Sequence, residues 1–409
     1  MEIIIKSITK KKYKTTRFIG IGGQGEAKEC VRLDTQASYV VKTYHDQFVN
    51  PAASIRLRWL VQQKLGLLCP VLKPPDDMYE DLHAHKLGHF TPYVTGESLE
   101  EFMQKPAPSL IDNLTIAVGF VHAIAVLHSR GIAHGDLQSN NIIINIINKN
   151  NKLVFEVYII DFDNFFAPGM PPPPCLGHEL YMAPESRNGG APSIQSDLFC
   201  LTAIMHELIL LKHVAAGFDS EQKLFEDTMT GGIWLHDPAL TRAQQKTAGG
   251  YPVAILNTDI MRLFRHGLSR DRAERPSALQ WERTLTPLLN EVFICPNCNG
   301  PTLIDASKTI CPFCHNPYPY LTLNIKGKLI PLTNGVNKFG RNEMGGSSRI
   351  SLIHTIVRRI GPEYWIEDIS LNGTYRWNGT GWLRLPKFKP VLLQKGNRLL
   401  FADLEGVVN

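Results

Sequence analysis

The chain has 409 residues, of which 44% are hydrophobic and 20% are charged, and its formal net charge is +5. This length is enough for two or three compact domains, and the composition is typical of globular proteins with hydrophobic cores. A membrane protein is not indicated, because the apolar run at residues 3–5 is short and the run at 198–211 is interrupted by His206 and Glu207. We therefore expect no membrane partner and a cytoplasmic location.

Positive charge is concentrated towards the C-terminus. Residues 321–409 contain 13 Lys and Arg against 6 Asp and Glu, a net +7, which leaves −2 for residues 1–320. A basic region of this kind favours an anionic partner. Nucleic acid is one such partner, although the motifs below disfavour it. The alternative is that these charges have no partner and only solvate a β-rich surface.

The predicted elements of the first 290 residues have an α+β order. Residues 15–45 form short apolar runs around glycines, which are typical of strands, whereas residues 113–130 and 197–212 carry apolar residues at helical spacing. Four consecutive prolines at residues 171–174 predict an extended loop.

A glycine-rich segment follows the first predicted strand. Gly20, Gly22 and Gly25 fit the pattern GxGxxG, in which missing side chains let backbone amides approach phosphate oxygens. Seventeen residues after Gly25, a strand pattern ends in Lys42, the residue type that holds the α- and β-phosphates of ATP in protein kinases. Taken alone, Lys42 could equally be a surface residue at a strand end.

The strongest signal for chemistry lies at residues 134–141. They read His-Gly-Asp-Leu-Gln-Ser-Asn-Asn and match H-x-D-L-x-x-x-N. Asp136 has the position of a carboxylate that accepts the proton of a substrate hydroxyl, and Asn141 has the position of an amide oxygen that binds Mg²⁺. Twenty residues after Asn141, an apolar strand leads into Asp161, a second candidate ligand of Mg²⁺.

Through these motifs, residues 12–290 resemble a protein kinase catalytic domain, which implies a two-lobed fold, ATP and Mg²⁺ as cofactors, and serine or threonine as acceptor. Residues 181–185, which read Tyr-Met-Ala-Pro-Glu, agree with the resemblance. In that family, the residue matching Glu185 pairs with the one matching Arg275. The residue matching Asp197 braces the catalytic loop.

Three departures from the kinase pattern lie near the catalytic loop. Gly135 replaces an arginine that grips a phosphorylated activation loop, and residues 162–180 contain no Ser, Thr or Tyr. We therefore expect activity that does not depend on phosphorylation of this segment. Asp163 stands where the family has glycine, and Gln138 where serine/threonine kinases usually have lysine, which leaves the choice of acceptor open.

A fourth departure is a missing acidic residue. The predicted helix at residues 52–65 contains no glutamate to pair with Lys42, which leaves its partner open; Gln62 and Gln63 are candidates for a weaker contact, a hydrogen bond without an ion pair. This gap supports one alternative, a pseudokinase scaffold. The His-Gly-Asp and Ile-Asp-Phe-Asp segments also resemble small-molecule kinases of the aminoglycoside and choline type, although those typically lack the segment at 181–185.

Four of the eight cysteines are scattered, and the other four form two CxxC pairs. The pairs, Cys295 with Cys298 and Cys311 with Cys314, are separated by twelve residues and are typical of a tetrahedral zinc site rather than of disulfides. Four protein ligands leave no open position, so we expect a structural zinc in a ribbon at residues 291–318. The alternative is four free thiols.

From Tyr320 onward, short alternating runs predict an all-β domain, with a hairpin where Asn378 and Gly379 lie between two tryptophans.

Residues 320–409 resemble forkhead-associated (FHA) domains, which are β-sandwiches whose loops bind phosphothreonine peptides. The resemblance rests on Gly-Arg, Ser-x-x-His and Asn-Gly-Thr motifs. It implies that Arg341 and Ser351 contact the phosphate and that Asn372 holds the peptide backbone. It also implies that His354 braces the loops. The alternative is a sandwich that has lost peptide binding.

The three predicted domains together also resemble a known architecture. A kinase, a zinc ribbon and an FHA domain in one chain resemble bacterial kinases encoded beside a PP2C-type phosphatase and a von Willebrand A-domain protein, as in tellurite-resistance-type clusters. The resemblance implies a phosphothreonine-containing partner such as either protein.

The FHA-like region departs from its family at one position. Leu371 stands where FHA domains often have a hydroxyl, so one phosphate contact of the family is missing from the pattern.

Overall fold

The computed structural model describes residues 4–105, 108–150, 152–173, 175, 177–216, 226–240, 250–289, 292–295, 297–303, 308, 310–318, 320–332, 335–360 and 363–409. The chain divides into two compact units, Met1–Tyr251 with Arg262–Thr286 and Pro252–Met261 with Pro287–Asn409. Each unit has buried apolar residues of its own. The predicted ribbon and the predicted β domain both fall in the second unit.

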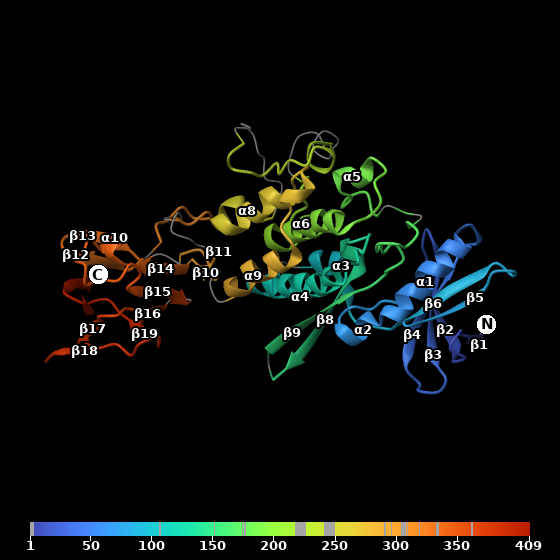
Figure 1. Cartoon of the computed structure of the whole chain (residues 1–409), viewed down its shortest axis with the longest axis horizontal. Helices are drawn as coiled ribbons and strands as arrows, with labels where there is room; N and C mark the ends of the chain where they lie inside the picture. The colour runs from blue at the N-terminus through green and yellow to red at the C-terminus, as the bar shows by residue number, and fades with distance from the viewer. Residues whose placement is uncertain are drawn as a thin grey trace. The chain divides into compact units, whose positions relative to one another are not determined.

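The first unit begins with an antiparallel sheet of six strands in the order β1-β2-β3-β4-β6-β5, drawn in blue in Figure 1. Its core consists of Tyr13, Cys30, Tyr39, Val41 and Phe90. The strands are β1 (Ile4–Lys6), β2 (Lys12–Ile21), β3 (Gly25–Arg32), β4 (Ser38–Tyr44), β5 (Asp77–Asp81) and β6 (Lys86–Pro92). The helices of this lobe are η1 (Asp46–Phe48), α1 (Pro51–Gln63) and α2 (Leu65–Leu68).

Helix α1 is fixed against the sheet through its capped start and its apolar face. The Asn50 side chain accepts a hydrogen bond of 2.9 Å from the backbone N of Ala53, which satisfies a free donor of the first turn. Leu57 of α1 packs on Met78 and Leu87 of the sheet. The helix therefore presents a defined face to the rest of the lobe.

The second lobe of this unit is mainly helical. Its central helices, α4 (Leu110–Ser129) and α6 (Ile194–Leu210), bury apolar residues on most of their surface. The lobe also contains α3 (Leu99–Met103), η2 (Ser139–Asn141), α5 (Pro184–Arg187), η3 (Glu226–Thr230) and η5 (Arg272–Glu274). Most of α8 (Thr258–Gly267) and of α9 (Ala278–Leu288) belongs to it as well, while the start of α8 and the end of α9 belong to the second unit. Among the described residues, α4 is long and apolar enough to cross a membrane, and its most apolar 18-residue stretch has a mean hydropathy of 1.9. However, 56% of this stretch is buried inside the protein, as in a core helix.

A hairpin sets the position of two candidate site residues. β8 (Ile142–Lys149) and β9 (Lys152–Ile159) pair antiparallel, with Ile142 opposite Ile159, and β7 (Glu97–Ser98) completes the sheet. The backbone N of Ile160 donates to the Asn141 carbonyl at 3.0 Å. The residues just before β8 and just after β9 therefore lie side by side, which brings Asn141 next to the segment that contains Asp161.

The second unit contains a small two-stranded ribbon and a β-sandwich. The ribbon strands are β10 (Val292–Ile294) and β11 (Pro301–Leu303), and η4 (Val253–Ile255) belongs to the same unit. Two antiparallel sheets, β13-β12-β21-β20-β17-β18 and β14-β15-β16-β19, share one apolar core, to which Leu323, Val357, Ile366 and Phe401 belong.

The bounds of the sandwich elements are as follows: β12 (Thr322–Ile325), β13 (Lys328–Pro331), β14 (Gly335–Phe339), α10 (Arg341–Met344), β15 (Thr355–Ile360), β16 (Glu363–Asp368), β17 (Thr374–Trp377), β18 (Trp382–Arg384), β19 (Val391–Leu393), β20 (Arg398–Phe401) and β21 (Leu404–Val408).

The elements expected from the sequence are present, with shifted ends. The predicted helix at 113–130 begins three residues earlier as α4, because the Ser109 side chain caps it by accepting a bond from Asp112 N at 3.1 Å. The tryptophan hairpin is confirmed, since Trp377 pairs with Trp382 and their ring centroids are 5.4 Å apart. The proline run is irregular at residues 171–173, and Pro174 lies outside the described residues.

Candidate functional site

The loop between β2 and β3 contains the three glycines of the GxGxxG pattern. Gly22 N donates to the Gly25 carbonyl at 2.8 Å and closes the hairpin. A Cβ on Gly25 would overlap the carbonyl oxygen of Thr43, so the close approach of β3 to β4 requires glycine here. A Cβ on Gly20 would meet nothing within 4 Å. The loop therefore leaves open space along its backbone, which a phosphate-bearing ligand needs.

Lys42, on β4, faces the segment that follows β9. Its Nζ lies 2.5 Å from Asp163 Oδ2 and 3.1 Å from Asp161 Oδ1. The predicted partner on α1 is wrong: Gln63 bonds within its own helix, and no hydrogen bond joins Lys42 to Gln62 or Gln63 in the described residues. The physical reason is that an ion pair with a carboxylate stabilises an ammonium group more than an amide oxygen does.

Asp163 is an enclosed carboxylate, with a side chain that is 4% exposed. Tyr44 OH donates to its Oδ1 at 2.8 Å, and His89 Nε2 lies 3.0 Å from the same atom. Burial by itself would raise the pKa of Asp163, but Lys42 and His89 outweigh burial and hold this pKa well below its ordinary value. Burial would likewise lower the pKa of Lys42, and Asp163 and Asp161 instead raise it. Both partners are therefore charged at neutral pH.

The catalytic-loop candidates Asp136 and Asn141 lie together. Asn141 Nδ2 donates to the backbone carbonyl of Asp136 at 2.8 Å, so its amide oxygen remains available as a ligand. Gln138 Nε2 lies 3.2 Å from both carboxylate oxygens of Asp136. Burial raises the pKa of Asp136, His134 opposes this shift, and the charge of Asp161 adds to it. Neighbouring carboxylates that repel each other suit a divalent cation.

Asp197, at the start of α6, braces this loop as predicted. Its Oδ2 accepts a hydrogen bond of 2.6 Å from His134 N, and its Oδ1 accepts one of 3.0 Å from Gly135 N. Gly135 has a φ of +79°, and a Cβ there would overlap the carbonyl oxygen of Asn164. The loop therefore requires glycine at position 135, which explains the absence of the family's arginine.

The predicted pair between Glu185 and Arg275 is also confirmed. The Arg275 guanidinium donates two hydrogen bonds to the Glu185 carboxylate, at 2.7 and 2.9 Å, and the arginine side chain is fully buried. Burial would raise the pKa of Glu185, but the bonds from Arg275 hold it below its ordinary value. This bidentate pair ties α5 to the residue that follows η5.

A pocket lies next to the catalytic loop. It is lined by Gln138 and Asn140 of the loop, by His178 and Tyr181, and by Glu207 of α6. Tyr181 OH donates to a Glu207 carboxylate oxygen at 3.0 Å, and burial raises the pKa of Glu207 to about 8. The pocket is a candidate position for the substrate segment that carries the acceptor hydroxyl.

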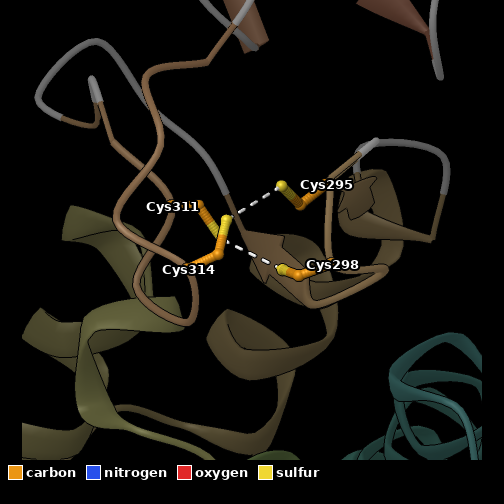
Figure 2. Close-up of side chains that lie close together, drawn as sticks. All are labelled: Cys295, Cys298, Cys311 and Cys314. Atoms are coloured by element: carbon orange, nitrogen blue, oxygen red, sulfur yellow. Dashed lines mark hydrogen bonds between the residues drawn. The ribbon is translucent and has the colours of Figure 1, made fainter.

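The four CxxC cysteines gather in the ribbon, as Figure 2 shows. Their sulfur atoms all lie within 4.8 Å of one another. The separation is 3.7 Å between Cys295 and Cys314 and 3.6 Å between Cys298 and Cys311. Tetrahedral zinc with bonds of about 2.3 Å requires sulfur atoms about 3.8 Å apart. Backbone amides two residues after Cys298 and Cys311 also donate to these sulfurs, at 3.4 Å each. The residues therefore fit zinc.

The three residues predicted to bind phosphopeptide converge on one loop of the sandwich. Arg341 Nε donates to the Ile350 carbonyl at 3.0 Å, and Asn372 Nδ2 donates to the Arg349 carbonyl at 2.6 Å. Ser351 Oγ accepts a hydrogen bond of 3.4 Å from the backbone N of Leu371. The contacts bring the three side chains to one end of the sandwich.

His354 has the bracing position expected from the sequence. Its Nδ1 accepts a hydrogen bond of 3.2 Å from Ser351 N, and its Nε2 lies 3.0 Å from the Gly373 carbonyl oxygen. The ring is fully buried, and burial lowers its pKa below the ordinary value. His354 therefore links the Ser-x-x-His loop to the Asn-Gly-Thr loop.

Three residues of the site were not predicted from the sequence. His89 and Tyr44 bond Asp163, and Arg56 of α1 donates to the Asp163 carbonyl oxygen at 2.7 Å. Asp163 itself was noted only as a departure from a motif. The signal that could have identified its role was the absence of an acidic residue on α1, since a buried lysine needs a carboxylate from some other element.

Comparison with known proteins identifies one family. Residues 13–285 match the family model described as protein kinase domain. Serine/threonine-protein kinase 33 of Mus musculus is 26% identical over 242 residues, which cover 55% of this chain and 47% of that protein. Serine/threonine-protein kinase PknD of Chlamydia muridarum is 24% identical over 293 residues, which cover 59% of this chain and 30% of that protein. The chain thus spans less than half the length of these relatives.

Proposed function

This chain belongs to the protein kinase domain family, and we propose that it transfers the terminal phosphoryl group of ATP to serine or threonine side chains of proteins. One observation carries the proposal. The β8–β9 hairpin joins Asn141 to the segment of Asp161, and Lys42 pairs with Asp161 at 3.1 Å, so the candidate phosphate and metal ligands form one cluster beside Asp136.

The roles of these residues follow from their chemistry. Asp161 and Asn141 offer oxygen ligands for Mg²⁺, and Lys42 together with the loop of Gly20, Gly22 and Gly25 would hold the phosphates of ATP. When bound, MgATP supplies the phosphoryl group. Asp136, whose pKa is raised by burial, would orient the acceptor hydroxyl and accept its proton.

The test is phosphoryl transfer by two variants. Asp136→Asn should reduce the rate roughly 10²–10⁴-fold, the usual contribution of a general base, with little change in melting temperature. Asp161→Asn should instead weaken Mg²⁺-dependent binding of ATP. An Asp136→Asn variant that labels protein at the wild-type rate would contradict the assigned role. Transfer to small molecules alone would favour the aminoglycoside or choline type, and binding without transfer would favour a pseudokinase.

We also propose that the ribbon holds one structural zinc ion. The four cysteines provide all the ligands of a tetrahedral site, so the metal would contribute to folding rather than to catalysis. Elemental analysis after purification without chelator should give about one zinc per chain. Less than about half an equivalent, with the four thiols titratable, would contradict the site.

For the sandwich we propose phosphothreonine recognition, with the phosphorylated segment supplied by this kinase or by a partner protein. The proposal is supported by the convergence of Arg341, Ser351 and Asn372 and by the net charge of +7 in residues 321–409. A guanidinium can make charge-assisted bonds to a phosphate group. A PP2C phosphatase or a von Willebrand A-domain protein is the kind of partner that the architecture suggests.

This binding is tested on the full chain with a labelled peptide in its phosphothreonine and threonine forms. Arg341→Ala should weaken phosphopeptide binding roughly ten- to a hundredfold, since charge-assisted bonds contribute about 1.5–3 kcal/mol each. The matched control is Arg398→Ala, which removes an exposed ion pair with Glu405. Equal affinity for the two peptides would end this proposal. A steep salt dependence spread over many positive residues would indicate nucleic acid instead.

A further inference from the structure

The lysine of the active site obtains its carboxylate partner from an unexpected element. Within the described residues, the α1 sequence from Pro51 to Gln63 contains neither Asp nor Glu. Lys42 instead lies 2.5 Å from Asp163, two residues beyond the candidate metal ligand Asp161. The acidic partner therefore comes from the segment after β9 and not from the helix.

Asp163 is built into the site more firmly than a surface ion pair would be. Its side chain is 4% exposed, and Lys42 approaches Oδ2 while Tyr44 OH and His89 Nε2 approach Oδ1 at 2.8 and 3.0 Å. Tyr44 lies two residues after Lys42 on β4, and His89 pairs with Lys42 across β4 and β6. The sheet thus holds the carboxylate from both sides of the lysine.

Helix α1 supplies a cation to the same segment. Arg56 donates to the carbonyl oxygens of Asp163 at 2.7 Å and of Pro171 at 2.9 Å, and its guanidinium lies 4.6 Å from the ring centre of Phe165. One turn further, Trp59 stacks on Phe165 with ring centroids 5.6 Å apart. Arg56 is 4% exposed, so these carbonyl bonds replace its hydration.

We propose that Asp163 is the positioning carboxylate of Lys42, and that Arg56 fastens α1 to the same segment through its bonds to the backbone carbonyls of Asp163 and Pro171. The inference rests on the proposed kinase function. It accounts for two departures from the kinase pattern at once. The helix α1 has no acidic residue for Lys42, and Asp163, where the family has glycine, provides the carboxylate in its place.

The proposal makes a specific claim about Mg²⁺. Lys42 donates a hydrogen bond to Asp161 and forms an ion pair with Asp163, and a metal ion bound by Asp161 would compete with Lys42 for the Asp161 carboxylate. Asp163 lets Lys42 remain paired and oriented while Asp161 serves the metal. Without Asp163, Lys42 would have Asp161 alone, and metal and lysine would compete for one group.

The experiment measures equilibrium binding of ATP to the full chain by calorimetry, with Mg²⁺ and with EDTA. Asp163→Asn keeps the shape of the side chain and removes its charge. We expect it to weaken binding of MgATP roughly tenfold, and binding of ATP in EDTA clearly less, because a single charge-assisted bond has about this value. The Mg²⁺ concentration for half-maximal activity should rise in parallel.

Two further variants separate positioning from structural damage. Asp237→Asn is the control for structural damage, because it removes a carboxylate away from the site that Arg265 binds through two nitrogens. We expect it to lower the fraction of molecules that bind ATP and to leave the affinity of the remaining molecules unchanged. Arg56→Gln removes the bonds to the two carbonyls and should weaken MgATP binding severalfold, again more with Mg²⁺ than in EDTA.

Three outcomes would overturn the inference. The first is an Asp163→Asn variant with unchanged affinity and only a smaller active fraction, like the Asp237→Asn control. The second is equal weakening with and without Mg²⁺. The third is tighter binding, which would mean that Asp163 withholds Lys42 from the nucleotide. Wild-type protein that binds no nucleotide would overturn the proposed kinase function as well.

Discussion

At residue 135 the backbone has a φ of +79°, and the space where a Cβ would project is filled by the carbonyl oxygen of Asn164. Its amide donates to Asp197, so the loop cannot shift without losing a buried hydrogen bond. This single position therefore decides that the catalytic loop reads His-Gly-Asp. Any side chain at residue 135 would strain the backbone, because of the positive φ, and would overlap the Asn164 carbonyl oxygen.

Gly135→Ala should accordingly cost more than about 3 kcal/mol and abolish transfer, because overlap adds to the strain of a left-handed residue. Gly131→Ala is the matched control: its φ is +70°, but a Cβ would meet nothing within 4 Å. That variant should lose only about 1 kcal/mol. Thermal unfolding of both variants measures the difference, and equal losses would show that overlap at residue 135 is relieved by movement.

Glu207 provides a prediction about pH. Burial raises its pKa to about 8 from an ordinary value of 4.5, so between these values the folded state holds a proton that the unfolded state has lost. The free energy of unfolding should therefore decrease as pH rises from about 4.5 to 8. Glu207→Gln can still accept the bond from Tyr181 and does not titrate.

The measurement is the stability of wild type relative to Glu207→Gln by urea unfolding at pH 5, 6.5 and 8. The free energy of unfolding of wild type, relative to that of Glu207→Gln, should decrease steadily as pH rises from 5 to 8. A difference that stays constant would mean that Glu207 has an ordinary pKa.

At the scale of elements, the ribbon and the sandwich are joined by Arg359 of β15. Its guanidinium lies 4.3 Å from the ring centre of Phe293 in β10, 5.6 Å from that of Tyr320 and 5.1 Å from that of Tyr364. Phe293 also belongs to the small core that contains Cys295 and Cys311. A cation among aromatic rings thus connects the cysteines of the proposed zinc site to the sandwich.

Arg359→Ala should therefore speed the loss of zinc to a chelator severalfold, because cation–π contacts contribute about 0.5–2 kcal/mol each. The control is its neighbour Arg358→Ala, which removes a more exposed pair with Glu367. Zinc release is followed with a colorimetric chelator. Equal rates in the two variants would mean that the ribbon holds its metal independently of the sandwich.

For the whole molecule, the sequence predicted those groupings of side chains that depend on spacing along the chain. Asp136, Asn141 and Asp161 follow one another at fixed spacing around a hairpin, and the four cysteines lie in two short turns, so spacing predicted both groups. The carboxylate for Lys42 could not be predicted in this way. Lys42 and Asp163 lie 121 residues apart in numbering, and only the packing of α1 and the sheet against the segment brings them together.

The division into two units gives a prediction for the whole chain. Each unit has its own buried core, the first with Tyr13, Phe90 and the central helices, the second with Leu323 and Phe401. Units with separate cores unfold as separate cooperative transitions. We expect calorimetry of the full chain to show two transitions, each moved by one ligand.

MgATP at 100 times its dissociation constant should stabilise the first unit alone by about 2.7 kcal/mol, because the proposed nucleotide site lies in that unit. A strong zinc chelator should lower the second transition alone, since loss of the metal removes folding free energy from the ribbon. Cys298→Ser should mimic the chelator, and Cys175→Ser, in the first unit, should not. If a single transition responded to both ligands, the cores would be energetically coupled, and binding of nucleotide would then change the affinity of the second unit for its own ligands by the same factor in both directions.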